Sequence, residues 1–268
     1  MTSRTLLCAG AAILLCLLCA AAFAPWIAPY DPAQQNLAND LAAPSNNHPL
    51  GTDKLGRDVL SRIVYGSRIS ALVGASTVTI AVLIGLLVGS LSGYGGGWLD
   101  HLLMRLVDIL MAFPGILLAI AFTAVLGPGL DHVVLALGLL GWTGYARLVR
   151  GEIMTLRERD FVHAAQALGG SPARVILLHM LPNLLPPLLI QATFGMAAAI
   201  LAEGSLSFLG LGAQPPTPSW GSMLNEGRQF ILVAPHLVAF PGLAIMVTIL
   251  GLNLVGDGLR DRLEKKGK

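Results

Sequence analysis

Six long apolar stretches dominate this sequence and limit what it can fold into. Each is close to the roughly 20 residues that an α-helix needs to cross the hydrocarbon core of a bilayer. A helix also pairs its own backbone N–H and C=O groups, for which lipid offers no partners. The stretches lie at 6–27, 69–91, 102–126, 133–149, 188–211 and 237–255. Hydrophobic residues make up 54% of the chain and charged residues only 12%, so we predict an all-α polytopic membrane protein with six transmembrane helices.

The lysines and arginines predict the orientation of these helices. Six spans place both termini on one side of the membrane. If that side is the cytoplasm, twelve basic residues lie in cytoplasmic segments and five in external ones, which agrees with the positive-inside rule. The cytoplasmic set is Arg4, Arg105, Arg147, Arg150, Arg157, Arg159, Arg174, Arg260, Arg262, Lys265, Lys266 and Lys268, and the external set is Lys54, Arg57, Arg62, Arg68 and Arg228. We predict cytoplasmic termini and no nucleic-acid partner, since topology accounts for the basic residues.

The spans divide the chain into four parts. Residues 1–28 form the first transmembrane helix, and 29–68 form an extracytoplasmic segment with a short interfacial helix. A core of five transmembrane helices occupies 69–258 and includes a cytoplasmic loop at 157–185, and 259–268 form a cytoplasmic tail. A secretory signal is the alternative for the first part, because Arg4 precedes an apolar run and Ala22-Phe23-Ala24 resembles a cleavage site. Cleavage would leave an odd number of spans, so we predict an uncleaved helix.

The cytoplasmic loop contains the pattern of two short helices. Asp160 is predicted to cap the first helix, Gly169 and Gly170 to end it, and Ser171-Pro172 to start the second. We expect the second helix to stop at Leu181-Pro182-Asn183. Phe161, Ala165 and Leu168 fall on one face of the first helix, beside the small side chain of Ala164. This face predicts a protein partner, and the alternative is a hairpin packed on its own helix bundle.

The external segment carries charges next to an apolar pattern. Thr52 or Asp53 is predicted to cap an interfacial helix whose apolar side is Leu55, Val59, Leu60 and Ile63. We expect the charged side chains of Lys54, Arg57, Asp58 and Arg62 to face water. Two interpretations remain open for this helix. It is either an interfacial clamp or a contact for a docking protein.

Charged and small residues inside the spans predict contacts between helices. Gly85 and Gly89 form a small-x-x-x-small pair that allows close helix packing. In the third span, Arg105 and Asp108 are three residues apart and are predicted to form an intramembrane ion pair, and we expect Pro114 to bend the helix. The fifth span contains Glu203, which requires a partner when buried. We predict that it locks helices together or lines a translocation pathway.

Four motifs resemble those of permease subunits of ATP-binding-cassette (ABC) importers, in the dipeptide, oligopeptide and nickel branch. Ala164, Ala165 and Gly169 match the alanines and the glycine of the coupling motif E-A-A-x-x-x-G, although His163 stands where the motif has Glu. Residues 48–58 (HPLGTDKLGRD) resemble H-P-L-G-T-D-x-x-G-R-D. Residues 203–212 resemble E-x-x-L-S-F-L-G-L-G, and 253–261 resemble N-L-x-G-D-x-L-R-D. The motifs occur in the expected order, on the expected sides of the membrane.

This resemblance implies a type I ABC importer permease fold in a bacterial inner membrane, with a cytoplasmic coupling-helix loop. The implied partners are a second permease subunit in a heterodimer, two cytoplasmic ATP-binding subunits, an extracytoplasmic solute-binding protein and the lipid bilayer. The implied ATPase-coupling residues are Asp160, Phe161, Ala164, Ala165, Leu168, Gly169, Leu181 and Pro182. The implied function is to form half of the translocation pathway for dipeptides or oligopeptides, and transport of nickel or a metal chelate by the same machinery is the alternative.

The sequence also argues against other classes of protein. It has no Gly-x-x-x-x-Gly-Lys-Ser/Thr loop, so ATP must be bound by a partner and the chain itself is predicted not to be an enzyme. It has neither a His-Glu-x-x-His nor a Gly-x-Ser-x-Gly motif. Cys8, Cys16 and Cys19 lie in the first apolar run as small filler, and we predict no metal or cofactor site. A stand-alone channel or secondary transporter would leave the cytoplasmic loop without a role.

Overall fold

The computed structural model describes residues 3–266, and within them the chain forms helices and no β-strand. Five helices are long and apolar enough to cross a membrane, and the bent pair α4 and α5 makes a sixth when its two halves are taken as one span. This confirms the predicted six-span all-α architecture. The long helices are α1 (Ser3–Ala22), α3 (Val59–Gly95), α6 (Leu130–Arg157), α9 (Leu181–Phe208) and α11 (His236–Lys266). The shorter ones are α2 (Ala24–Ile27), α4 (Gly97–Met111), α5 (Gly115–Leu126), α7 (Asp160–Ala167), α8 (Pro172–Arg174) and α10 (Trp220–Gly227).

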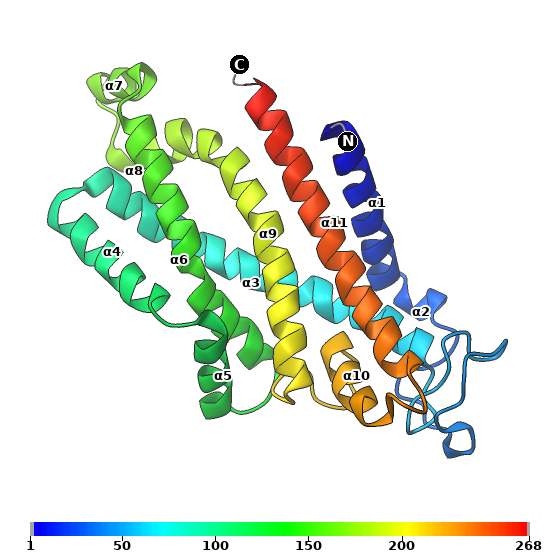
Figure 1. The fold of residues 1–268 in the computed structure, drawn as a ribbon. Coiled ribbons are helices and arrows are strands. Elements are labelled where there is room, and N and C mark those ends of the chain that lie inside the picture. Colours follow the sequence, from blue (N-terminus) through cyan, green and yellow to red (C-terminus); the bar gives the residue numbers. More distant parts are fainter. Residues whose placement is uncertain (1–2, 267–268) are drawn as a thin grey trace.

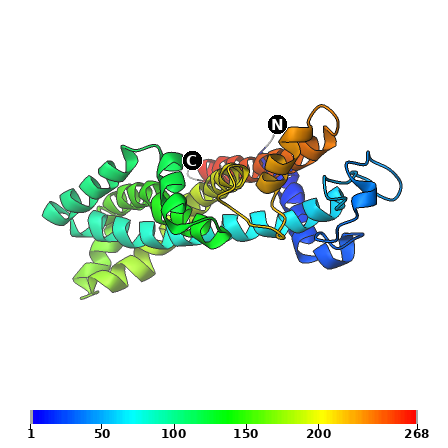
Figure 2. The ribbon, with the colours of Figure 1, turned by 90° about the horizontal axis from the view of Figure 1, so that it is seen from below.

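The helices form a bundle with two distinct ends. Figure 1 shows both termini at the same end as α7 and α8, whereas α2, α10 and the long segment before α3 lie at the opposite end. Viewed from below, α3 runs along most of the length of the molecule (Figure 2). It contacts α1, α6 and α9 and continues into α4. The loop at 158–171 and the external segment therefore lie at opposite ends of the bundle.

Glycines set the spacing of the main helix pair, α3 and α6. A Cβ atom at Gly85 would lie 2.4 Å from Tyr145 Cβ, and one at Gly89 would lie 2.6 Å from the Ala146 carbonyl oxygen. The predicted Gly85/Gly89 packing face is thus confirmed, and α6 is its partner. The same principle joins α1 to α11, where a Cβ at Gly10 would lie 2.7 Å from the Gly251 carbonyl oxygen.

The third span is broken rather than bent. α4 and α5 meet at an angle of 83° across the short connection that contains Pro114. Proline disfavours a helical conformation in the residue before it and has no N–H to donate, which accounts for the break at this place. At 1.5 Å per residue each half is roughly 18 to 23 Å long, which is too short to cross the hydrocarbon core alone.

The predicted interfacial helix is wrong as a separate element. Val59, Leu60 and Ile63 belong to the first turns of α3, whose N-terminus is capped by Asp58. Thr52 and Asp53 do not cap a helix but instead hydrogen-bond within the external segment. The amphipathic pattern arises because one side of this part of α3, with Val59 and Ile63, is buried against α10 and α11.

The second helix of the loop does not stop at Leu181-Pro182-Asn183 as predicted. Helical structure continues from α8 through a π-helical segment, Val175–Met180, into α9. Pro182 occupies the first turn of α9, and the side chain of Asn183 donates to the His179 carbonyl at 2.9 Å. Pro172 to Phe208 is therefore one helical span. At the C-terminus α11 continues through most of the predicted tail, and Lys268 lies outside the described residues.

Candidate functional site

The turn after α7 is built from two glycines. Gly169 has φ +82°, a left-handed conformation that glycine adopts without steric cost. Its N–H donates to the Gln166 carbonyl at 2.9 Å, and the Gly170 N–H donates to the Ala165 carbonyl at 3.0 Å. This pair of bonds is the Schellman motif that ends many helices. The predicted role of Gly169 as the end of the first loop helix is confirmed.

The start of the next helix also follows the prediction. The Ser171 side chain accepts from the Arg174 N–H, and Pro172 occupies the first turn of α8. At the other end of the loop, however, Asp160 does not cap α7. Asp160 is the first residue of that helix, and the capping position belongs to Arg159, whose side chain makes no capping hydrogen bond. A carboxylate in the first turn still favours the helix through its dipole.

The exposed face of α7 differs from the predicted face in one residue. Val162 is buried, and Ala165 packs against the same core, which includes Val175 and Met180. The outward face consists of Phe161, Ala164 and Leu168, of which Phe161 is 42% and Leu168 89% exposed. The predicted Phe161/Ala165/Leu168 face is therefore corrected to Phe161/Ala164/Leu168. One face packs on the bundle, as the hairpin alternative predicted, and the other is exposed, so the protein partner for that face stays a prediction.

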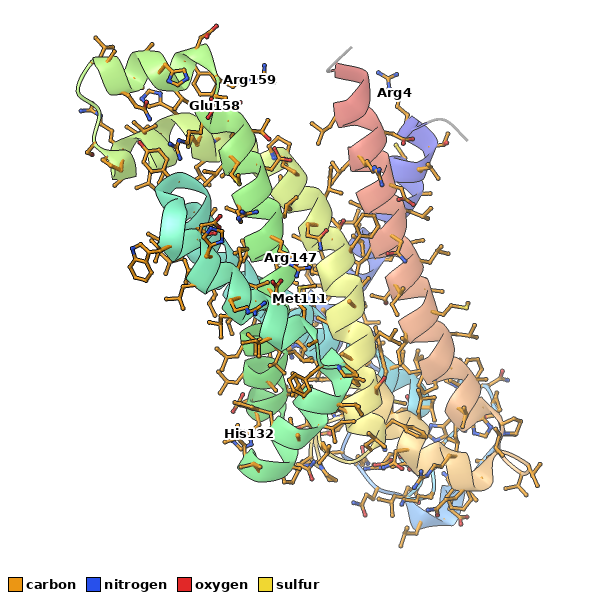
Figure 3. The ribbon with its side chains drawn as sticks, turned by 60° about the vertical axis from the view of Figure 1, so that its left-hand side comes forward. Arg4, Met111, His132, Arg147, Glu158 and Arg159 are labelled. Carbon is orange, nitrogen blue, oxygen red and sulfur yellow. The ribbon has the colours of Figure 1, made fainter. Side chains whose placement is uncertain are left out.

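Hydrogen bonds fix the orientation of α7 on the bundle. Tyr94, near the end of α3, contacts both sides of the loop. The Gln166 side chain donates to the Tyr94 hydroxyl at 3.2 Å, and Arg157 Nη1 donates to the Tyr94 carbonyl at 3.3 Å. The exposed apolar face of α7 is thus held at a defined angle at the end of the molecule (Figure 3), where Glu158 and Arg159 are labelled.

The charges of the external segment form a buried network rather than facing water. Arg57 Nε donates to Asp53 at 2.6 Å, and Arg62 Nη1 donates to the same carboxylate. Glu226 of α10 accepts from Arg57 at 2.5 Å and from Arg62 at 3.0 Å. Only Lys54 of the four predicted surface charges is exposed. The network fastens the start of α3 to α10, which supports the interpretation of this region as a clamp.

The network stabilises the ionised form of Asp53. Burial alone would raise the pKa of this carboxyl, but the Arg62 and Arg57 guanidiniums and the N–H groups of Leu55 and Arg57 outweigh burial and lower the pKa below 3.8. A lowered pKa adds stability at pH values above the unfolded pKa. That stability is lost as the pH falls through the folded pKa, so the network is fully formed at neutral pH.

Glu203 is a link between α9 and α10. Its carboxylate is 1% exposed and accepts from the Ser207 hydroxyl at 2.6 Å and from the side chain of Ser219, the N-cap residue of α10. The two helices also meet closely, since a Cβ at Gly221 would lie 2.2 Å from the Gly204 carbonyl oxygen. These contacts favour the predicted role of Glu203 as a helix lock.

We expect Glu203→Gln to retain most assembly and transport, because an amide oxygen can accept the same serine hydroxyl. Glu203→Leu should reduce the yield of assembled complex, since it leaves buried hydroxyls without partners at a cost of about 1 to 3 kcal/mol. Complex yield after affinity purification measures the difference. A Leu variant that assembles and transports normally would exclude any role for the carboxylate.

The predicted Arg105–Asp108 ion pair is wrong. Asp108 pairs instead with Arg147 of α6, and no described residue forms an ion pair with Arg105. The spacing of three residues permits a pair within one helix, but a partner from the neighbouring helix was not visible in the sequence. A second link between α4 and α6 is bidentate, because Arg150 Nε and Nη2 each donate to Asp100 at 2.6 Å.

A cavity of about 330 Å³ lies between α3, α5, α6 and α9. Small side chains leave this space open, among them Gly115, Gly141 and Ala198. Its few polar groups include Gln191, the Tyr145 hydroxyl and the Thr77 hydroxyl, which is buried and has no partner among the described residues.

Sequence analysis missed the partners that complete these sites. Each missed partner binds a residue for which the sequence alone did not indicate this contact. The missed partners are Glu226, Ser219, Ser207 and Tyr94. One signal was available for two of them. Ser219 and Glu226 lie in a polar stretch between two spans and bracket the apolar residues Trp220 and Met223, a pattern typical of a short capped helix.

Comparisons with known proteins match nearly the whole chain. Residues 81–267 match the family described as binding-protein-dependent transport system inner membrane component, and residues 3–44 match the N-terminal TM domain of oligopeptide transport permease C. A dipeptide transport system permease protein of Alkalihalophilus pseudofirmus is 47% identical over 97% of this chain and 85% of its own length. A glutathione transport system permease protein of Escherichia coli is 47% identical over 97% of this chain and 86% of its own.

Solved structures show the same fold at lower identity. Two inward-facing crystal forms of the MetNI methionine ABC transporter match with TM-scores of 0.60 and 0.61 at 19% and 20% identity. The first match covers 77% of this chain and 96% of the other, and the second covers 78% and 97%. This likeness confirms the predicted type I permease fold. From the family match and from relatives that align over almost its full length, the chain belongs to the inner membrane permeases of binding-protein-dependent peptide ABC importers.

Proposed function

We propose that this chain forms one half of the translocation pathway of an importer for small peptides. The observation that carries the proposal is the exposed face of α7, formed by Phe161, Ala164 and Leu168, at the end of the bundle where both termini lie. An apolar helix face on a rigid turn suits a groove of a partner protein. The chain has no phosphate-binding loop of its own, so the partner proposed for this face is an ATP-binding subunit.

The proposed assembly has two permeases in a heterodimer, two ATP-binding subunits at the α7 end and a solute-binding protein at the α10 end. ATP-driven closure of the ATPase pair draws the two coupling loops together. Each nucleotide state then favours one conformation of the permease pair, inward-open or outward-open, and transport follows from this preference. The substrate passes from the binding protein into the path between the permeases.

Peptides are the proposed substrates because of the names of the relatives. These include a dipeptide permease, a di/tripeptide permease of Pseudomonas aeruginosa that is 44% identical over 97% of this chain, and a glutathione permease. Glutathione is itself a tripeptide. Nickel or a metal chelate is the second candidate. The two are separated by uptake into vesicles that contain the complete transporter and its binding protein.

We expect ATP-dependent uptake of a radiolabelled dipeptide and copurification of two ATPase subunits with the tagged permease. Competition by a tripeptide should reduce uptake, whereas Ni²⁺ at the same concentration should not. The control is a transporter whose ATPase subunits lack the phosphate-loop lysine, which should assemble but not transport. A permease that purifies without ATPase subunits and transports by itself would contradict the proposal.

The proposed orientation has both termini and α7 in the cytoplasm and the external segment outside. In a background with Cys8, Cys16 and Cys19 replaced by alanine, a cysteine at Gln34 should react with an impermeant thiol reagent added to intact cells. A cysteine at Arg157 should react only in inside-out vesicles. The reverse labelling pattern would contradict the topology inferred from the basic residues.

A further inference from the structure

An exposed charged cluster lies within the membrane-spanning part of the bundle. Arg147 is 17 residues after Leu130, the first residue of α6, or roughly 25 Å along the helix. A hydrocarbon core of about 30 Å that begins near this end of α6 would include it. Figure 3 shows Arg147 and Met111 about halfway between His132 at one end and Glu158 and Arg159 at the other. The Arg147–Asp108 pair therefore lies at membrane depth, so Arg147, which the sequence count assigned to a cytoplasmic segment, lies inside the span instead.

The chain itself does not bury this ion pair. The side chains of Arg147 and Asp108 are 48% and 52% exposed, and Arg105, one turn away on α4, is exposed as well. Charges exposed at this depth do not face acyl chains but face a water-filled space or another protein. A cavity of about 500 Å³ adjoins them, lined by residues of α4 and by Arg150 of α6.

The broken span gives independent evidence for water on this side. Ala112, Phe113 and Pro114 connect α4 to α5, and all three are exposed. The Ala112 N–H still donates to the Asp108 carbonyl and the Pro114 carbonyl accepts from Leu118, so the regular helical pairing is interrupted at Phe113. Irregular backbone at membrane depth is tolerated only where it is buried in protein or lines an aqueous cavity. The break follows Asp108 by one turn, so the exposed connection lies close to the ion pair in the chain.

The charges in this cluster do not balance. Asp100 is paired with Arg150, and Asp108 with Arg147. Arg105 has no ion-pair or hydrogen-bond partner among the described residues, although it lines the same cavity. One cation is therefore left over in a space that the chain keeps open. Such a group attracts an anion, and a guanidinium matches a carboxylate with two parallel hydrogen bonds.

We propose that Arg105, positioned next to the Asp108–Arg147 pair, binds the C-terminal carboxylate of a peptide in the inner half of the translocation pathway. This inference rests on the proposed function, since it takes peptides as the substrate. The carboxylate is common to all unmodified peptides, so a site for it holds substrates of different sequence. Arg147 is a positioning residue, because its bond to Asp108 keeps that acid from neutralising Arg105.

The test uses the complete transporter in inside-out vesicles, where substrate reaches the inner half of the path without the binding protein. Leu102 lines the same cavity and is exposed, so Leu102→Cys in the cysteine-free background reports access to it. We expect the cysteine to react about fivefold faster with an anionic sulfonate reagent than with a cationic ammonium reagent of the same size. Arg105→Gln should abolish this preference, and Arg105→Lys should retain it.

Millimolar dialanine should slow the labelling at least threefold, whereas its C-terminal amide should not. An unreactive Leu102→Cys would mean that the second permease covers this face, and it would overturn the proposal. Equal protection by acid and amide, or protection that survives Arg105→Gln, would overturn it as well. Labelling does not require transport, so a transporter that takes up dipeptide but fails these tests refutes only the carboxylate site.

Discussion

Gly169→Val is expected to abolish peptide uptake while leaving normal amounts of permease in the membrane. At φ +82° a residue with a branched Cβ costs roughly 1 to 2 kcal/mol and resists the Schellman turn. That cost lowers the ratio of correct to incorrect turn by a factor of about 5 to 30. Insertion of the spans does not depend on this turn. The expected loss of uptake therefore comes from a changed direction of α8 relative to α7, and not from a failure of membrane insertion.

Space does not explain this expected effect. A Cβ at Gly169 would meet no atom within 4 Å, so the valine side chain fits and only the backbone is strained. Gly151 offers a matched control, because it lies in α6, has no atom within 4 Å of an added Cβ and does not have a positive φ. Gly151→Val should assemble and transport normally. Gln166→Ala is a poorer control, because the Gln166 side chain donates to the Tyr94 hydroxyl.

The measurements are ATP-dependent dipeptide uptake and the amount of ATPase subunit that copurifies with each variant. We expect Gly169→Val to retain less than about a fifth of the ATPase that the unmodified permease retains. Undiminished uptake by Gly169→Val would refute the assignment of this loop as the coupling element. Loss of permease from the membrane would instead identify the turn as a folding requirement.

Asp53→Ala should destabilise the external end of the protein by about 3 to 5 kcal/mol, because it leaves two buried guanidiniums with only Glu226 to balance them. Arg62 is 2% exposed and Arg57 4%, so water cannot replace the lost carboxylate. Removing Asp53 also deletes the acceptor for the N–H groups of Leu55 and Arg57. We expect α10 to detach from the start of α3.

The temperature at which purified complex aggregates, followed by size-exclusion chromatography after heating, measures this effect. Asp40→Ala is the matched control, since Asp40 is an exposed aspartate in the same external segment. It should leave the temperature unchanged, and Asp53→Asn should fall between the two. An Asp53→Ala variant as stable as the unmodified protein would show that the network contributes no net stability, which is known for some buried ion pairs.

Local features of this chain could be predicted from the sequence, and contacts between distant segments could not. Gly169 and Ser171 were predictable because a left-handed glycine and a capping serine act on their immediate neighbours. The Arg105–Asp108 prediction failed because Arg147, thirty-nine residues beyond Asp108, competes for the same carboxylate. Charge alone indicated that Arg57 and Arg62 face water, whereas Asp53 and Glu226 make their burial possible.

The helix boundaries failed for a related reason. A proline after a short helix usually ends that helix, because its nitrogen has no hydrogen to donate. Pro182 follows a π-helical segment whose carbonyl groups are already left to donors other than the proline nitrogen, so the helix continues. Asn183 supplies one of these donors from its side chain. Where these helices end depends on hydrogen bonds between particular groups in three dimensions, which hydrophobic periodicity does not encode. The same periodicity was sufficient to predict six spans.

The continuous helical run from Pro172 to Phe208 gives the two ends of the protein a mechanical connection. Its 37 residues extend over roughly 55 Å, from the turn after α7 to the serines that hold Glu203. Three prolines, at 182, 186 and 187, lie in the part nearest α7 and limit easy bending to that part. Beyond them the helix acts as a lever arm. A small rotation at the α7 end is then expected to arrive, enlarged, at the contact between Gly204 and α10 at the opposite end of the bundle.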